Sequence, residues 1–113
     1  MIRKIIFSVC VFFCVQFSFA QKLKTFLKQG EDAMKDKDYY SACQYYNQAM
    51  LIDSANMEIQ WKYAEASRLN YDFDLAKNWY DKIFKIDNLK NYPEAPYWIG
   101  VILKGKGQYK EAN

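Results

Sequence analysis

The stretch Lys37-Asp38-Tyr39-Tyr40-Ser41-Ala42 returns further along the chain as Tyr71-Asp72-Phe73-Asp74-Leu75-Ala76. A third version, Gly107-Gln108-Tyr109-Lys110-Glu111-Ala112, follows after a slightly longer spacing. In each version an aromatic residue precedes an alanine by three positions. The first two versions begin at residues 37 and 71, a spacing of 34 residues. A fixed period of this length is the signature of structural repeats that stack on one another. The pattern predicts an all-α chain that is built from repeated units.

Each unit has the apolar spacing of two helices joined by a short polar turn. In the first unit, apolar residues recur three or four positions apart through residues 23–34 and 42–50. Pro93 and Pro96 mark the first helical turn of the third unit, where proline costs little. One hairpin cannot bury its own apolar face, so stacking on the next hairpin supplies the core. The expected repeats are about 23–56, 57–90 and 93–113, with the third truncated.

Small residues stand at a fixed place in the first helix of each unit. Gly30 aligns with Ala64 and, after the longer spacing, with Gly100. We predict that the two helices of a hairpin approach closely at Gly30 and Ala42. The ring of Tyr46 should fill the space beside them.

These positions resemble the tetratricopeptide repeat, a helix hairpin with small and aromatic residues at fixed places and the same period. The resemblance covers residues 23–113 and implies a right-handed α-solenoid. Gln29 departs from the pattern where leucine is usual, and Ser54 and Asn88 stand where the linker proline is usual. In the first copy the matching residues are Phe26, Gly30, Tyr39, Ala42, Tyr46 and Ala49.

The segment 1–20 has the pattern of a signal peptide. A short basic start with Arg3 and Lys4 precedes an apolar run that ends in Ser18-Phe19-Ala20. Small residues three positions and one position before the cut are what signal peptidase accepts, so we expect cleavage between Ala20 and Gln21. The alternative is an uncleaved helix that anchors the protein in a membrane.

A narrower resemblance links the chain to the amino-terminal repeats of Bacteroidota-type envelope proteins. It rests on the leader followed by Gln21-Lys22, on Gly30-Glu31-Asp32-Ala33, on residues 38–42, and on residues 62–70. In those proteins a β-propeller-like region and an OmpA-type domain follow, and some members support type IX secretion. The resemblance implies a protein of the periplasm or outer membrane. Because Asn113 follows directly on the Ala112 marker, we expect this chain to be a fragment of a longer protein.

Composition argues against catalysis and for binding. The chain has no histidine, and Cys43 is the one cysteine outside the leader, so no catalytic centre, metal site or cofactor is expected. Cys43 is expected to be an inert core thiol. Arg3 and Lys4 account for two of the 16 basic residues, which leaves 14 to balance 13 acidic ones. Mixed signs of this kind do not make a nucleic-acid footprint.

The first helices of stacked hairpins line a concave face on which a peptide or protein partner can lie. Trp61 and Tyr97 offer aromatic anchors there, or they pack between repeats instead. Glu31 and Glu65 stand where one subtype of the family carries asparagine to clamp a carboxylate, which favours a cationic or mixed ligand surface. The candidate partner-binding residues are Leu27, Glu31, Trp61, Glu65, Arg68, Tyr97 and Val101.

Three functional hypotheses follow. The first is an exported interaction scaffold of the cell envelope, the second is the membrane-anchored structural subunit, and the third is an enzyme whose catalytic domain lies downstream.

The leader hypothesis predicts the mass of the mature protein. Intact mass spectrometry of the exported chain should give a first residue of Gln21, because Ser18 and Ala20 form an acceptable cleavage site. A chain that keeps Arg3 and Lys4 would support the anchored alternative.

Overall fold

The computed structural model describes the backbone of residues 2–112 and the side chains of residues 9, 11 and 17–107. Within residues 2–112 the chain is all-helical and has no strand, which confirms the all-α prediction. The helices are α1 (Ile2–Lys35), α2 (Tyr39–Ile52), α3 (Met57–Leu69), α4 (Phe73–Asp87) and α5 (Ala95–Ala112).

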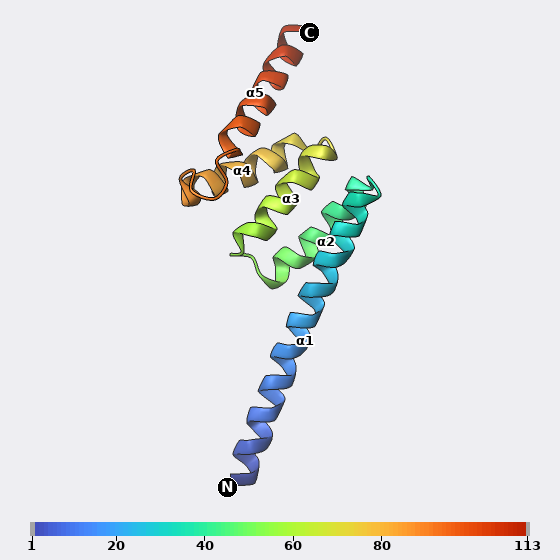
Figure 1. Ribbon diagram of the computed structural model, residues 1–113, viewed down its shortest axis with the longest axis vertical. Coiled ribbons are helices and arrows are strands. Elements are labelled where there is room, and N and C mark those ends of the chain that lie inside the picture. Colours follow the sequence, from blue (N-terminus) through green and yellow to red (C-terminus); the bar gives the residue numbers. More distant parts are fainter. Residues whose placement is uncertain (1, 113) are drawn as a thin grey trace.

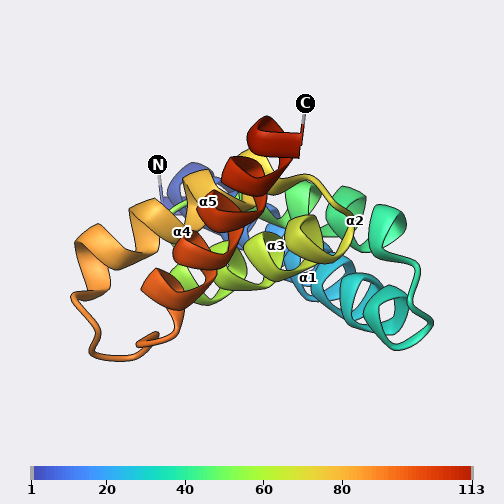
Figure 2. The same ribbon diagram turned by 90° about the horizontal axis from the view of Figure 1, so that it is seen from above.

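Helices that follow one another in sequence pack against one another in space (Figure 1). The carboxyl-terminal half of α1 pairs with α2, and α3 pairs with α4. Helix α3 also packs on α2, and α5 packs on α4, as the view from above shows (Figure 2). The molecule extends 72 × 31 × 22 Å because α1 projects from one end of this body and α5 from the other.

The turns of the two hairpins have the same geometry, as expected for a repeated sequence. Lys37 and Tyr71 occupy equivalent places and both have left-handed backbones, with φ of 59° and 63°. The N–H of Asp38 donates to the carbonyl of Ala33 at 2.9 Å, and the N–H of Asp72 donates to the carbonyl of Ser67 at 2.8 Å. This arrangement satisfies the last carbonyls of α1 and α3. A non-glycine residue in this conformation costs roughly 1–2 kcal/mol.

The first hairpin closes around Gly30, as predicted. A Cβ atom added to Gly30 would lie 2.5 Å from the ring of Tyr46, which is only 2 % exposed. Ala42 is fully buried in the same region. The absence of a side chain at Gly30 therefore lets the tyrosine ring of α2 lie against the backbone of α1.

The second hairpin repeats this packing with Ala64 in place of the glycine. Ala64, Ala76 and Tyr80 are fully buried in one cluster, which Ile102 of α5 joins. The sequence predicts helices over residues 57–69 and 75–86, and the structure has Met57–Leu69 and Phe73–Asp87. The second helix begins earlier than predicted, and its first turn is closed by the N–H of Ala76, which donates to the carbonyl of Asp72 at 3.0 Å.

The two ends of the chain differ from the expected repeat pattern. Helix α1 runs without a break through Ala20 and Gln21, where the sequence predicts the boundary between leader and domain. Helix α5 continues through Gly107 to Ala112, where the third copy of the turn pattern predicts a break. Among the described residues, no helix is long and apolar enough to cross a membrane.

Cys43 lies in the core of the first hairpin, as predicted. Its side chain is 8 % exposed, and its sulfur lies 3.9 Å from the hydroxyl of Ser67 on α3. Burial raises the pKa of the Cys43 thiol, which keeps it in the unreactive protonated form.

The same substitution should have opposite effects at two equivalent glycines. Gly30→Ala should lower the free energy of unfolding by about 1–2 kcal/mol, because the buried Tyr46 ring cannot make room for the methyl group. Gly100→Ala should raise it by about 0.5–1 kcal/mol, because nothing lies within 4 Å of the added Cβ and alanine favours the helix. Urea unfolding followed by circular dichroism measures both. Equal stabilisation by the two variants would contradict the close approach at Gly30.

Candidate functional site

The candidate partner-binding residues all lie on α1, α3 and α5. Leu27 and Glu31 border a hollow of about 510 Å³ along α1. Glu31, Trp61 and Glu65 border a hollow of about 380 Å³ between α1 and α3. Arg68 and Val101 border a larger groove of about 940 Å³ between α3 and α5. The structure thus distributes these residues over three hollows, and Tyr97 borders none of them.

Glu31 does not stand free to receive a cationic ligand. The ammonium of Lys62 on α3 donates to its carboxylate at 2.6 Å, and Lys62 also lies 3.6 Å from Glu58. The hydrogen bond from Lys62 lowers the pKa of Glu31. Lys62 is a residue that the sequence did not single out, and it ties the first helices of the two hairpins together.

Trp61 takes part in packing between the repeats. Its ring meets the edge of Tyr80 at 5.2 Å between centroids and stacks on Tyr92 at 5.0 Å. Tyr92 belongs to the loop between α4 and α5, which lies beyond the second hairpin. Of the two alternatives for Trp61, the structure therefore favours inter-repeat packing.

Asp87 holds the loop that brings Tyr92 onto Trp61. Its buried carboxylate accepts hydrogen bonds from the backbone N–H of Tyr92 at 2.7 Å and of Asn91 at 2.8 Å. Burial opposes the ionisation of Asp87, but these donors outweigh it and lower the pKa of the carboxyl group. The spacing between the second and third copies is longer than that between the first two. The extra residues therefore lie in an ordered loop.

Arg68, Glu65 and Tyr80 form one hydrogen-bonded network in the second hairpin. The Tyr80 hydroxyl donates a short hydrogen bond to Glu65. Arg68 donates to Glu65 at 2.9 Å and to the Tyr80 hydroxyl at 3.2 Å. Burial is the main reason why the pKa of Tyr80 is raised, so this hydroxyl keeps its proton.

The same arginine reaches α5. Its guanidinium carbon lies 3.7 Å from the centroid of the Trp98 ring, within cation–π distance. Arg68 therefore connects α3, α4 and α5. The sequence predicts that Arg68 binds a partner, whereas in the structure its guanidinium is engaged by Glu65, Tyr80 and Trp98 of the same chain.

Tyr97 remains an exposed aromatic residue. It is 62 % exposed, and its ring meets the Trp98 ring edge-on at 4.9 Å between centroids. Tyr97 can therefore present its exposed ring to a partner while the ring also contacts its neighbour Trp98.

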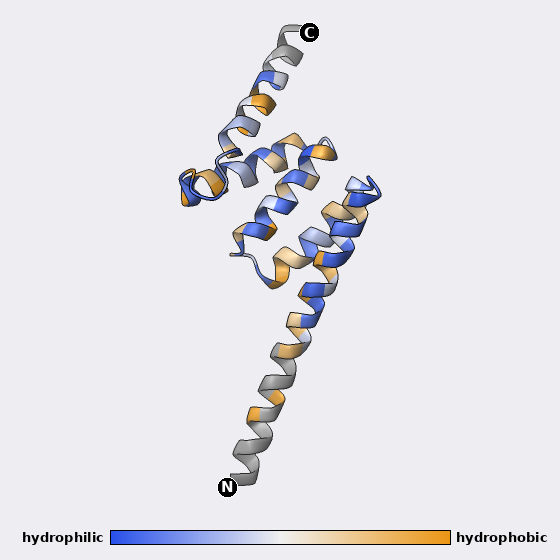
Figure 3. Ribbon diagram, in the orientation of Figure 1, coloured by the Kyte–Doolittle hydropathy of each residue, from blue (hydrophilic) through white to orange (hydrophobic). Residues whose placement is uncertain are grey.

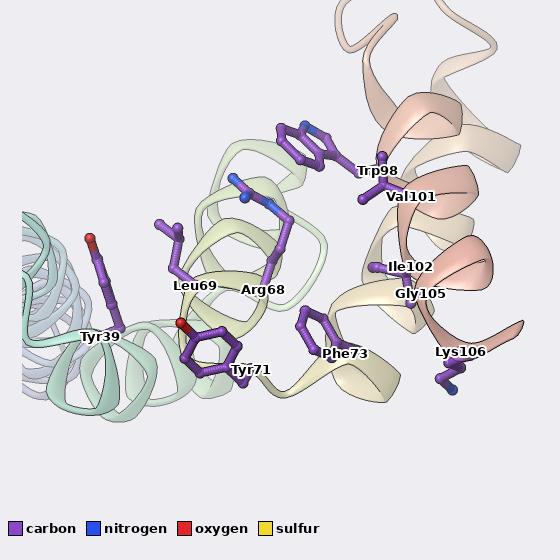
Figure 4. A pocket seen from close by; sticks show the side chains of 10 residues that line it. All are labelled: Tyr39, Arg68, Leu69, Tyr71, Phe73, Trp98, Val101, Ile102, Gly105 and Lys106. Atoms are coloured by element: carbon purple, nitrogen blue, oxygen red, sulfur yellow. The ribbon is translucent and has the colours of Figure 1, made fainter. Parts of the chain in front are cut away.

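The groove between α3 and α5 is larger than the two other hollows described above, and most of its lining residues are not among the candidate partner-binding residues that the sequence predicts. We call it the α3–α5 groove (Figure 4). Figure 3 shows apolar residues gathered in the middle of α5, which forms one wall. The lining residues are Tyr39, Arg68, Leu69, Tyr71, Phe73, Trp98, Val101, Ile102, Gly105 and Lys106.

The floor of the α3–α5 groove comes from the turn between α3 and α4. Tyr71 is 82 % exposed and meets Phe73 edge-on at 6.0 Å between ring centroids. Phe73 is 39 % exposed although it aligns with Tyr39 as a signature position of the repeat. Lys106 of α5 pairs with Asp74 beside this floor. A sequence signal was available in Tyr71, a large aromatic residue at a turn position where the third copy has glycine.

No family model matches this chain, and no curated protein matches it either. Among the described residues, no three histidine, cysteine, aspartate or glutamate side chains come together in a way that could hold a metal ion. The groove described above presents mainly apolar and aromatic side chains, and its charged residues Arg68 and Lys106 are paired with Glu65 and Asp74.

Removal of one hydroxyl tests the network in the second hairpin. Tyr80→Phe should lower the free energy of unfolding by about 1–3 kcal/mol, because Glu65 and Arg68 lose a buried partner. Tyr46→Phe is the matched control at the equivalent position of the first hairpin, and it should change stability by less than about 0.5 kcal/mol. Thermal unfolding of both variants provides the comparison. Equal losses would show that the network contributes nothing.

Proposed function

We propose that this protein is an exported scaffold of the bacterial cell envelope that binds a protein or peptide partner through stacked tetratricopeptide-type repeats. The single observation that carries the proposal is the α3–α5 groove. The groove has a volume of about 940 Å³ and is lined mostly by apolar and aromatic side chains, as is typical of binding sites. It adjoins α3 and α5, which belong to the helices on which the sequence places the partner.

The repeat assignment rests on two further observations. The hairpins α1–α2 and α3–α4 each have a left-handed residue at the equivalent turn position and a tyrosine at the equivalent position of the second helix, packed near a small residue of the first. Each helix packs on its neighbour in sequence, as in a stack of hairpins that would form a right-handed solenoid. The export and envelope parts of the proposal rest on the leader pattern and on the narrower resemblance to envelope proteins with an OmpA-type domain.

A second candidate function follows from α1. Because this helix is continuous from Ile2 to Lys35, an uncleaved leader could hold the repeats at a membrane as part of a structural subunit. Both candidates place the same binding surface outside the membrane. They differ in whether the mature protein keeps the segment 1–20.

The proposed function predicts that peptides bind in the α3–α5 groove and not on the exposed face of α2. Peptides selected from a random library against the immobilised protein should lose at least about tenfold in affinity to Val101→Glu, because the charge enters an apolar groove. Leu51→Glu is the matched control, since Leu51 is 75 % exposed on α2. Failure to select any peptide, or equal loss in both variants, would contradict the proposal.

A further inference from the structure

The carboxyl-terminal end of α4 exposes large apolar side chains to solvent. Ile86 in the last turn of the helix is 69 % exposed, and Leu89 in the loop that follows is 48 % exposed. Ile52, the equivalent of Ile86 in the first hairpin, is partly buried. Figures 1 and 2 both place this end of α4 at the edge of the body, away from α2. The two side chains therefore contribute little to the core.

Three exposed lysines surround these apolar side chains. Lys82 stands three positions before Lys85 and four before Ile86, so the three residues share one face of α4. Lys90 follows directly on Leu89. Among the described side chains, none of the three lysines forms an ion pair. We call this surface, which consists of Lys82, Lys85, Ile86, Leu89 and Lys90, the α4 tip.

The charge of the α4 tip is positive. Asp87 is the one acidic residue within positions 82–93, and its buried carboxylate is occupied by backbone N–H groups of the loop. The next acidic residues along the chain are Asp81, which pairs with Lys77 at 2.8 Å, and Glu94. An anionic surface that meets the α4 tip would therefore find three lysines without an anionic partner.

The shape and the charge of the α4 tip together favour a bilayer as its occupant. None of its five residues borders the three hollows described above, so the tip offers no concave site for a peptide or a small molecule. Exposed apolar side chains can enter the boundary between headgroups and acyl chains, while lysines beside them attract anionic headgroups. A symmetric contact with a second copy is disfavoured, because lysines would face lysines.

We propose that the α4 tip docks on an anionic lipid surface, with Ile86 and Leu89 in the interfacial layer and the three lysines against the headgroups. Asp87 supports this contact by ordering the loop that carries Leu89 and Lys90. The inference goes beyond the proposed function, because it assigns a second surface that would orient the scaffold against a membrane. It holds whether or not the mature protein keeps the segment 1–20.

Two charge variants test the role of the lysines. Cosedimentation should show at least about tenfold tighter binding to vesicles of equal parts phosphatidylcholine and phosphatidylglycerol than to vesicles of phosphatidylcholine alone. The double variant Lys85→Gln/Lys90→Gln should weaken binding to the anionic vesicles at least about fivefold. Lys35→Gln/Lys37→Gln is the matched control, since it removes the same charge from exposed positions at the turn of the first hairpin and should leave binding unchanged. Equal binding to both vesicles, or equal losses in the two variants, would overturn the proposal.

Two tryptophan variants test the apolar contact independently of any binding by the segment 1–20. Leu89→Trp places a reporter at the α4 tip, and Leu51→Trp places one at the end of α2. Leu51 is 75 % exposed, but positions 39–61 contain no lysine or arginine. After subtraction of the parent emission, lipids with brominated acyl chains should quench Leu89→Trp at least about twofold more strongly than Leu51→Trp, because only the α4 tip enters the interface. Equal quenching, or stronger quenching of Leu51→Trp, would show that the α4 tip is not the docking surface.

The outcomes separate this inference from the proposed function. If peptides bind in the α3–α5 groove while Lys85→Gln/Lys90→Gln leaves vesicle binding unchanged, the scaffold function stands and the lipid contact fails. If the α4 tip docks on anionic vesicles while no peptide is selected, the lipid contact stands and the scaffold function fails.

Discussion

The contact between a small residue on the first helix of a hairpin and a tyrosine on the second sets the geometry of this molecule. At Gly30 the Tyr46 ring lies 2.5 Å from the place where a Cβ would be, so the ring packs directly against the backbone of α1. Ala64 and Tyr80 repeat the arrangement in the second hairpin. This contact fixes the distance between paired helices, and through it the surface onto which the next helix packs.

The second hairpin adds a polar network to this apolar contact. Tyr80 fills the space beside Ala64 and also holds Glu65 and Arg68 with its hydroxyl. Arg68 then lies over Trp98, which joins α5 to the hairpin. Because one buried ring serves both the core and the network, the position of α5 depends on the packing of α3 against α4.

This shared use of residues has a consequence for binding. Residues on the first helices that could meet a ligand are partly committed to neighbours: Glu31 to Lys62, Trp61 to Tyr92, and Arg68 to Trp98. What remains open is apolar and aromatic surface, chiefly Tyr71, Phe73 and Val101. The groove therefore offers contact area first and charge second.

The sequence by itself determined the local structure: the helices of the two hairpins, the places of their turns, and the close approach at Gly30. These features depend on residues within one repeat period, where helical spacing and residue size are enough to specify them. It also placed Leu27, Glu31, Trp61, Glu65, Arg68, Tyr97 and Val101 on the first helices. Their partners, and the groove itself, were decided only by the tertiary structure.

The physical reason is that several of these contacts join residues from different repeats: Glu31 with Lys62, Trp61 with Tyr92, and Arg68 with Trp98. Tyr92 reaches Trp61 because Asp87 orders the loop between α4 and α5, and no periodic pattern encodes the path of that loop. Helix α5 likewise continues through Gly107, although the repeat pattern predicts a turn at that position. Spacing along the chain determines which face a residue occupies. The angle between packed hairpins determines what that face meets.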